Sequence, residues 1–116
     1  MDYENKARGL FHKDGANCSQ AVAAAFADKI GLTEEKAMEV TPPPRSIEGK
    51  CGAVLASEMI LEKLSIDKKD EFEERFKKIN KYIECKPLVA HKKEVGKTCH
   101  DIVADAAGIL AEMIGD

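Results

Sequence analysis

The stretch that decides the fold is Cys51-Gly52-Ala53-Val54-Leu55-Ala56-Ser57-Glu58-Met59-Ile60-Leu61-Glu62-Lys63-Leu64. Its apolar residues recur at spacings of three and four, which is the period of a helix, and they cover a broad face. The same spacing recurs along the chain, whereas the few β-branched residues do not alternate with polar ones as they would in strands. We therefore predict a central helix within an all-α, compact bundle of five to seven helices.

Caps and breakers divide the rest of the chain into helical segments. Two residue pairs fit the capping box, in which a cap residue and the residue three positions later bond each other's backbone: Asn17 with Gln20, and Thr98 with Asp101. Glycine and proline mark the ends of the segments, because proline lacks an amide and disfavours helix at the residue before it. The predicted helices are 3–13, 17–31, a short one capped by Thr33 and ended by Pro42-Pro43-Pro44, 50–64, 67–80, a short one starting near Cys85, and 98–114.

The apolar faces of these helices define a predicted core. Phe72, Phe76 and Ile79 are spaced four and three apart and give the highly charged 67–80 segment a single buried stripe. A chain of 116 residues is long enough for such a core to hold it folded without disulfides, as one domain spanning residues 1–116. The predicted core residues are Val22, Phe26, Val54, Leu55, Leu61, Phe72, Phe76, Val103, Ala106 and Leu110.

Charge and hydropathy restrict the partners and the compartment. The chain has 18 Lys and Arg residues against 21 Asp and Glu residues, for a net charge of −3. This balance argues against nucleic acid as the main partner, because phosphate binding needs a clustered basic surface. The segment 1–6 carries charges where a secretory signal would be apolar, and no apolar run approaches the length of a membrane span. We expect a cytoplasmic protein without a membrane partner; self-association into a homo-oligomer stays open.

The candidate functional residues are the four cysteines, Cys18, Cys51, Cys85 and Cys99. In a reducing compartment, cysteines are more often catalytic, redox-sensing or metal-binding than bridged for stability. Each of the four falls within the first turn of a predicted helix. Unpaired amides and the positive end of the helix dipole favour a thiolate at that place, so the shared placement predicts lowered thiol pKa values.

Inert packing is the alternative interpretation. Free cysteine is often fully buried, and Cys99 continues the apolar face of its helix. Gly52 and Ala56 leave a nearly bare face after Cys51, which either receives another helix, such as the one carrying Ala21, or lets a second thiol or a ligand approach Cys51. Glu58 lies two turns after Cys51 and would influence the thiols only if that face were buried; a glutamate there usually reaches solvent.

The ordered cysteines resemble a known family. The segments that carry the resemblance are Asn17-Cys18-Ser19-Gln20-Ala21-Val22, Gly49-Lys50-Cys51-Gly52-Ala53-Val54-Leu55-Ala56, and the lone Cys85 and Cys99 ahead of an alanine-rich helix. Together they resemble the C-GCAxxG-C-C family of putative redox-active proteins over most of the chain, with Ala56 where the family pattern closes with glycine. The resemblance implies a redox function in which the four cysteines are the defining residues, with no established substrate.

Three functions remain in competition. Thiol redox chemistry ranks first: we expect Cys51 to attack, Cys18 to be its partner, and a buried Cys99 to be resolving or structural, with an unknown electron donor or thiol partner and an unknown cofactor. Binding of a metal or iron–sulfur cluster by the four cysteines ranks second, because no ligand pair is close in sequence, so we expect no bound zinc or iron. A structural or interaction domain ranks third. One cluster of four sulfurs would favour metal, close pairs redox, and scattered sulfurs packing.

Overall fold

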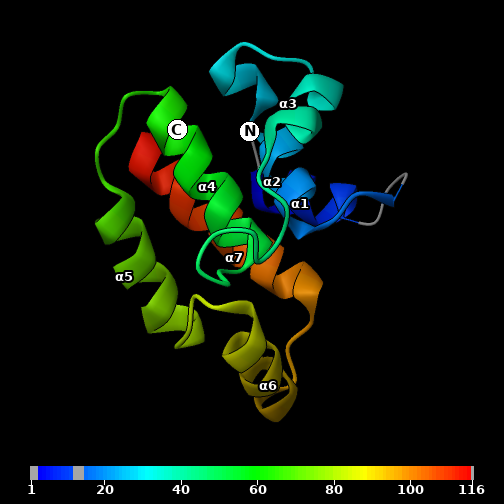
Figure 1. The fold of residues 1–116 in the computed structure, drawn as a ribbon, viewed down its shortest axis with the longest axis vertical. Helices are drawn as coiled ribbons and strands as arrows, with labels where there is room; N and C mark the ends of the chain where they lie inside the picture. The colour runs from blue at the N-terminus through cyan, green and yellow to red at the C-terminus, as the bar shows by residue number, and fades with distance from the viewer. Residues whose placement is uncertain (1–2, 12–14, 116) are drawn as a thin grey trace.

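The computed structural model describes residues 3–11 and 15–115 and confirms the all-α fold (Figure 1). Within the described residues there is no strand, and the one β-like feature is an isolated antiparallel bridge between Lys50 and Glu84. None of the helices in this part of the chain combines the length and the apolar character needed to cross a bilayer. The α-helices are α1 (Tyr3–Leu10), α2 (Cys18–Ala25), α3 (Glu34–Val40), α4 (Gly52–Lys63), α5 (Lys69–Asn80), α6 (Cys85–Val95) and α7 (Cys99–Ile114), and a 3₁₀ helix, η2, spans Ala27–Ile30.

The predicted caps are confirmed. Asn17 accepts a hydrogen bond from the amide of Gln20, and the Gln20 side chain accepts one from the amide of Asn17, which completes the capping box of α2. Thr98 and Asp101 form the same box at α7. Each box satisfies amides that no helical carbonyl can reach, so these two helix starts are fixed by local sequence.

One predicted helix is corrected, and the predicted end of another falls outside the described residues. The 17–31 segment is not one helix: α2 ends at Ala25, Phe26 leaves helical geometry (φ −104°, ψ 13°), and η2 then runs to the left-handed cap at Gly31. Phe26 is fully buried, and its ring stacks on that of Tyr3 with centroids 4.2 Å apart, so tertiary packing accounts for the break. The first helix ends at Leu10; the predicted end at residues 12–14 lies outside the described residues.

The helices α4 and α7 lie side by side at the centre of the molecule (Figure 1). The helices α1 and α2 cover one side of this pair, α5 lies along the other side, and α6 lies beyond the ends at which α4 and α7 begin. All ten predicted core residues are buried, and the greatest exposure among them is 4% at Leu55. The apolar faces predicted from the sequence are therefore oriented correctly.

Ile79 is the exception on α5, since it is 50% exposed. The buried row of α5 follows the i, i+4 spacing from Phe72 through Phe76 to Asn80, whose side chain is buried in its place. Asn80 donates to Asp105 Oδ2 (3.3 Å) and accepts from Lys97 Nζ (2.8 Å). A hydrogen-bonded asparagine is stable in such a position, because burial costs little when both ends of the amide are paired.

We predict that Phe72→Ala lowers the free energy of unfolding by about 3–5 kcal/mol, because it removes a fully buried aromatic ring and leaves a cavity. The matched control is Ile79→Ala on the same helix, which should change stability by less than about 0.5 kcal/mol because that side chain is half exposed. Urea unfolding followed by circular dichroism measures both. Equal losses in the two variants would contradict the orientation of α5.

Candidate functional site: four thiols around one cavity

Four helices begin at one place in the molecule and bring the four cysteines together. Cys18, Cys85 and Cys99 are the first residues of α2, α6 and α7, and Cys51 is the N-cap of α4, which confirms the predicted placement at helix starts. All four are free thiols. They line a single cavity of about 50 Å³ whose other lining residues are Leu88, Val89, Lys92 and Ile102.

Backbone hydrogen bonds join the starts of α4 and α6. The amide of Cys51 donates to the carbonyl of Ile83 (2.7 Å), and the amide of Cys85 donates to the carbonyl of Gly49 (2.8 Å). These bonds flank the antiparallel bridge between Lys50 and Glu84. Two cysteines separated by the whole of α4 and α5 are thereby held at neighbouring positions, which no short sequence motif encodes.

The close approach predicted at Gly52 is confirmed, and its occupant is Cys18. A Cβ atom placed on Gly52 would lie 2.6 Å from Cys18 Sγ, and also 3.0 Å from Pro44 Cγ and 3.1 Å from Ser19 Cβ. No real side chain fits at these distances. Both uses of the bare face proposed from the sequence therefore apply, because α2 packs against α4 there and a second thiol approaches Cys51.

The thiols of Cys18 and Cys51 are hydrogen-bonded to each other. This bond from Cys51 lowers the pKa of Cys18 to about 7, with help from the backbone of Ser19, Ala53 and Gly52 and against the effect of burial. The same bond, together with burial, raises the pKa of Cys51 well above its ordinary value. The two shifts therefore favour ionisation at Cys18 and a protonated thiol at Cys51.

This asymmetry overturns the expectation that Cys51 is the more ionised thiol. The sequence argument relied on the open approach beside Gly52, but that space is filled by the Cys18 sulfur itself. Cys51 is 5% exposed, whereas Cys18 is only partly buried. Within this pair the more exposed and more readily ionised sulfur is that of Cys18.

Cys85 and Cys99 occupy the outer part of the site. Burial raises the pKa of Cys85, and the positive charges of Arg45 and Lys92 oppose that rise. Lys92 Nζ contacts Cys99 Sγ, and Cys99 is half-buried rather than buried as the sequence suggested. Sequence reasoning missed Lys92, although it lies seven residues after Cys85 and hence on the same face of α6.

A family model described as putative redox-active protein (C_GCAxxG_C_C) matches residues 16–113. The chain belongs to this family. The matched region contains all four cysteines and the Gly52 contact, so the residues that define the family line one cavity in this member. A search of curated proteins and a search of solved structures found no match.

Metal ligation by this family member was the second alternative. Among the described residues, no group of three or more His, Cys, Asp or Glu side chains is arranged to hold a metal ion. The four sulfurs therefore line one cavity without forming a ligand cluster, and one pair of them is in hydrogen-bond contact. Cys18 and Cys51 thus form a contact pair, but no two of the four cysteines stand at disulfide-bonding distance, so the predicted disulfide pairing stays a prediction.

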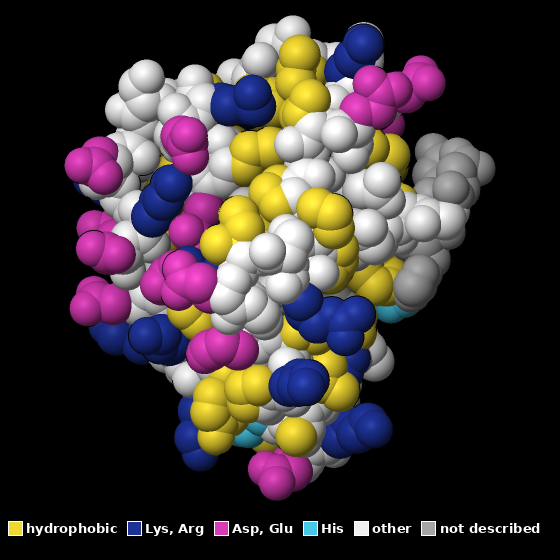
Figure 2. All heavy atoms as spheres, in the orientation of Figure 1, with side chains coloured by type: hydrophobic (Ala, Val, Ile, Leu, Met, Phe, Trp, Pro, Cys, Tyr) yellow, Lys and Arg dark blue, Asp and Glu magenta, His cyan; other side chains and the backbone are white. Residues whose placement is uncertain are grey.

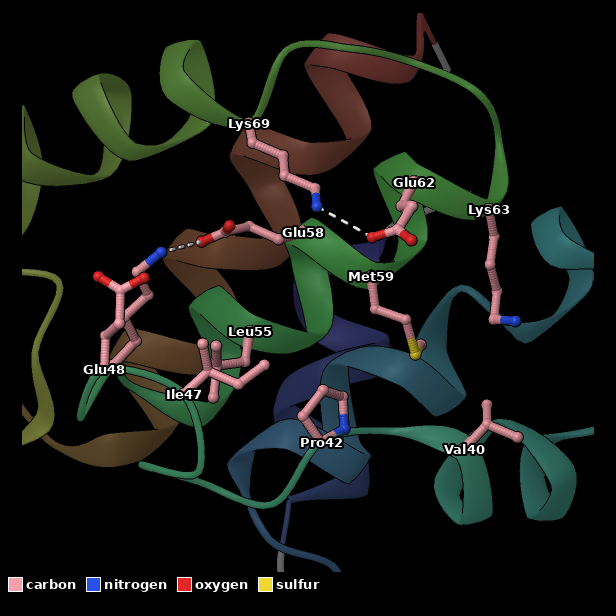
Figure 3. Close-up of a pocket in the computed structure, with 11 residues that line it drawn as sticks. Val40, Pro42, Ile47, Glu48, Leu55, Glu58, Met59, Glu62, Lys63 and Lys69 are labelled. Atoms are coloured by element: carbon pink, nitrogen blue, oxygen red, sulfur yellow. Dashed lines mark hydrogen bonds and ion pairs between the residues drawn. The ribbon is translucent and has the colours of Figure 1, made fainter.

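A larger pocket of about 390 Å³ runs along α4 and shares no lining residue with the thiol cavity (Figure 3). Its polar side holds Glu58, which is only 13% exposed and pairs with Lys50 Nζ at 3.4 Å; the expectation that Glu58 reaches solvent is wrong. Lys50 also pairs with Glu73 at 2.8 Å. Burial and the neighbouring Glu73 carboxylate raise the pKa of Glu58 to about 7.

We predict that Gly52→Ala lowers the free energy of unfolding by about 1–3 kcal/mol and lowers the yield of a Cys18–Cys51 disulfide, because the new methyl displaces the Cys18 sulfur. Gly9→Ala in α1 is the matched control: its Cβ meets nothing within 4 Å, and alanine is the better helix former, so stability should rise slightly. Urea unfolding and disulfide mapping measure the two effects. Wild-type behaviour of Gly52→Ala would refute the close contact.

The pKa of Glu58 predicts a pH dependence of stability. The folded protein keeps this proton up to about pH 7, whereas the unfolded chain releases it near the ordinary value of 4.5. The stabilisation that the protonated Glu58 side chain gives the folded protein is therefore complete below pH 4.5 and is lost as the pH rises through 7. Glu58→Gln, which mimics the protonated form, should gain about 1 kcal/mol relative to wild type between pH 5 and pH 8.

Urea unfolding of both proteins at pH 5 and pH 8 measures this difference. The exposed Glu39→Gln variant on α3 serves as control and should follow the wild type at both pH values. A Glu58→Gln variant that loses stability relative to wild type as the pH rises would show that the ionised form, paired with Lys50, is the favoured one.

Proposed function

We propose that this protein is a thiol redox protein whose reactive pair is Cys18 and Cys51. The observation that supports the proposal is the hydrogen bond between the two thiols, which divides them into a partly exposed thiolate with a pKa of about 7 and a buried thiol. A thiolate is the attacking species in thiol–disulfide exchange, and a pKa near the ambient pH combines sufficient ionisation with good nucleophilicity. The second thiol stands in contact with the first and is ready to resolve the product.

The reaction proceeds in two exchanges. The Cys18 thiolate attacks one sulfur of a substrate disulfide, forms a mixed disulfide with it, and releases the other sulfur as a thiolate. Cys51 then loses its proton to solvent or to the released thiolate and attacks Cys18 Sγ, which forms the Cys18–Cys51 disulfide and releases the second substrate thiol. The substrate disulfide is reduced by two electrons and the protein dithiol is oxidised by two. An external dithiol or another electron donor restores the reduced pair.

Cys85 and Cys99 lie beside the same cavity, so a disulfide formed at Cys18 has further thiols near it. Cys85 responds to the charges of both Cys18 and Cys99, so both lie within electrostatic reach of it. We assign these two cysteines an auxiliary part, in which they accept the disulfide from Cys18 or resolve the mixed disulfide when Cys51 does not.

The same convergence favours one second candidate, a soft metal ion or an iron–sulfur cluster held by the four thiols. Thiolates suit zinc, monovalent copper and iron–sulfur clusters, and ligands far apart in sequence can meet in a helical bundle. Four sulfurs around one cavity support this candidate, although their present arrangement would have to tighten. About one metal per chain in the purified protein, lost in Cys51→Ser, would place it first.

We predict that Cys18 alkylates with a pH midpoint near 7 and that Cys51→Ala moves this midpoint up toward about 8.5, since the variant removes the hydrogen bond that stabilises the thiolate. Cys51→Ser is the matched variant: its hydroxyl can still donate, so the midpoint should stay closer to that of the wild type. Iodoacetamide labelling across the pH range, read by peptide mass spectrometry, gives the midpoint for each cysteine.

Mild oxidation followed by disulfide mapping completes the test. The expected product is an intramolecular bridge between Cys18 and Cys51. Midpoints at or above about 8.5 for all four cysteines, with no intramolecular bridge formed, would remove the redox function and leave packing as the role of the thiols.

A further inference from the structure

We infer that the thiol site takes disulfides that carry negative charge beside the scissile bond, and that Arg45 and Lys92 provide this selectivity. The inference rests on the proposed redox function and adds the chemical class of the substrate. It is carried by Lys92, which lines a cavity whose lining contains no carboxylate, and by Arg45, which lies outside that lining but within electrostatic reach of Cys85.

The helix starts give the site a positive field before any side chain is considered. The helices α2, α4, α6 and α7 contain 8, 12, 11 and 16 residues, and each directs its N-terminal end toward the cavity through the cysteine that begins it. The partial positive charges at these ends add in the same place. Apart from the cysteines and Lys92, the cavity walls are Leu88, Val89 and Ile102, which screen charge far less than water does.

The two cations reinforce this field. Lys92 lines the cavity from α6 and contacts Cys99 Sγ. Arg45, an exposed residue of the loop before α4, acts on Cys85 through its positive charge. Arg45 is held in the left-handed region (φ 67°), and its amide donates to the carbonyl of Lys50 (3.0 Å). This bond ties the position of Arg45 to the residue next to Cys51.

Neither cation is neutralised by a carboxylate within the described part of the chain. Lys50, Lys69 and Lys97 each form an ion pair there, whereas Arg45 and Lys92 form none. Both therefore keep their charge available to a ligand at the thiol site. An unpaired cation at a cleft attracts and orients anionic groups more strongly than one already engaged in an ion pair.

The carboxylates on the neighbouring segments do not cancel the positive charge around the thiol site. Glu48 lines the larger pocket along α4, and Glu94 is exposed near the far end of α6, beside His91. Glu84 precedes Cys85 and is the one acidic residue adjacent to a site cysteine. In Figure 2, Lys and Arg side chains gather in the lower middle of this face, toward α6, whereas the left edge, over α5, shows Asp and Glu side chains mixed with Lys and Arg side chains.

This charge distribution affects two steps of the exchange. It attracts an anionic disulfide to Cys18, and it stabilises the thiolate that leaves when the first disulfide bond breaks. A cationic disulfide meets repulsion in the encounter. The rate constants should therefore fall in the order anionic, neutral, cationic, with at least about a tenfold range at low ionic strength.

The test uses three disulfides of similar size: 3,3′-dithiodipropionate, hydroxyethyl disulfide and cystamine, which are anionic, neutral and cationic. The reduced full-length protein reacts with each at pH 7.5, and mass spectrometry follows the mixed disulfide at Cys18 and the Cys18–Cys51 product. Rates are divided by those of a small uncharged dithiol with the same disulfides, which removes differences in intrinsic reactivity. We expect the anion-to-cation ratio to exceed about ten at low salt and to shrink markedly in 0.5 M salt.

The variants Arg45→Gln and Lys92→Gln should each lower the anion-to-cation ratio by about three-fold or more, and Lys36→Gln, an exposed lysine on α3, should leave it unchanged. The ratio is measured within one protein, so a variant that folds less completely still reports it. If the neutral disulfide reacts but the ratio is flat or inverted, the inference is overturned and the redox function stands. If none of the three disulfides reacts at Cys18, the proposed function is overturned and the inference with it.

Discussion

The site depends on the absence of a side chain at Gly52. Because no Cβ stands there, the Cys18 sulfur enters the space and reaches Cys51, at the place where α2 packs on α4. The alanines of α2 at positions 21 and 23–25 are fully buried, so the contact continues along the helix as close packing of small residues. Ser19, beside Cys18, donates its hydroxyl to the carbonyl of Pro42 (2.7 Å), which fixes the proline segment against the same turn. The absence of a Cβ atom at Gly52 therefore permits both the packing of α2 on α4 and the contact between the two thiols.

Much of the fold could be predicted from the sequence because its causes are local. The capping boxes at Asn17 and Thr98 need only residues three positions apart, and the core faces follow from helical periodicity. The prediction that Ile79 is buried was wrong because periodicity cannot distinguish it from Asn80. The burial of Asn80 depends on Asp105 and Lys97 in other segments. The break at Phe26 likewise depends on a ring contributed by another helix.

The cysteines of the candidate site could be predicted from the sequence, but which of the paired thiols ionises more readily could not. The placement of cysteines at helix starts and the bare surface at Gly52 were visible in the sequence, and they identified the Cys18–Cys51 pair. Which sulfur is ionised depends on which one is enclosed, and that is known only once α2 and α4 are docked. The effect of Arg45 on Cys85 and the contact of Lys92 with Cys99 also arise from docking, since in each case the two residues lie on different segments.

The four helix starts at the thiols differ from one another in how their amides are satisfied. Asn17 and Thr98 cap α2 and α7 with their side chains, whereas Cys51 at α4 and Glu84 at α6 make no side-chain cap hydrogen bond. A missing cap typically costs about 1 kcal/mol of helix stability. At α4 the backbone amides of Gly52 and Ala53 instead donate hydrogen bonds to the Cys18 sulfur. These bonds favour the thiolate and are weakened when the sulfur enters a disulfide, so they stabilise the reduced pair relative to the oxidised one. A dithiol stabilised in this way has a higher reduction potential, as in other proteins in which a stabilised thiolate makes the disulfide a stronger oxidant. In the proposed function, the uncapped start of α4 therefore lowers local helix stability and raises the reduction potential of the thiol pair.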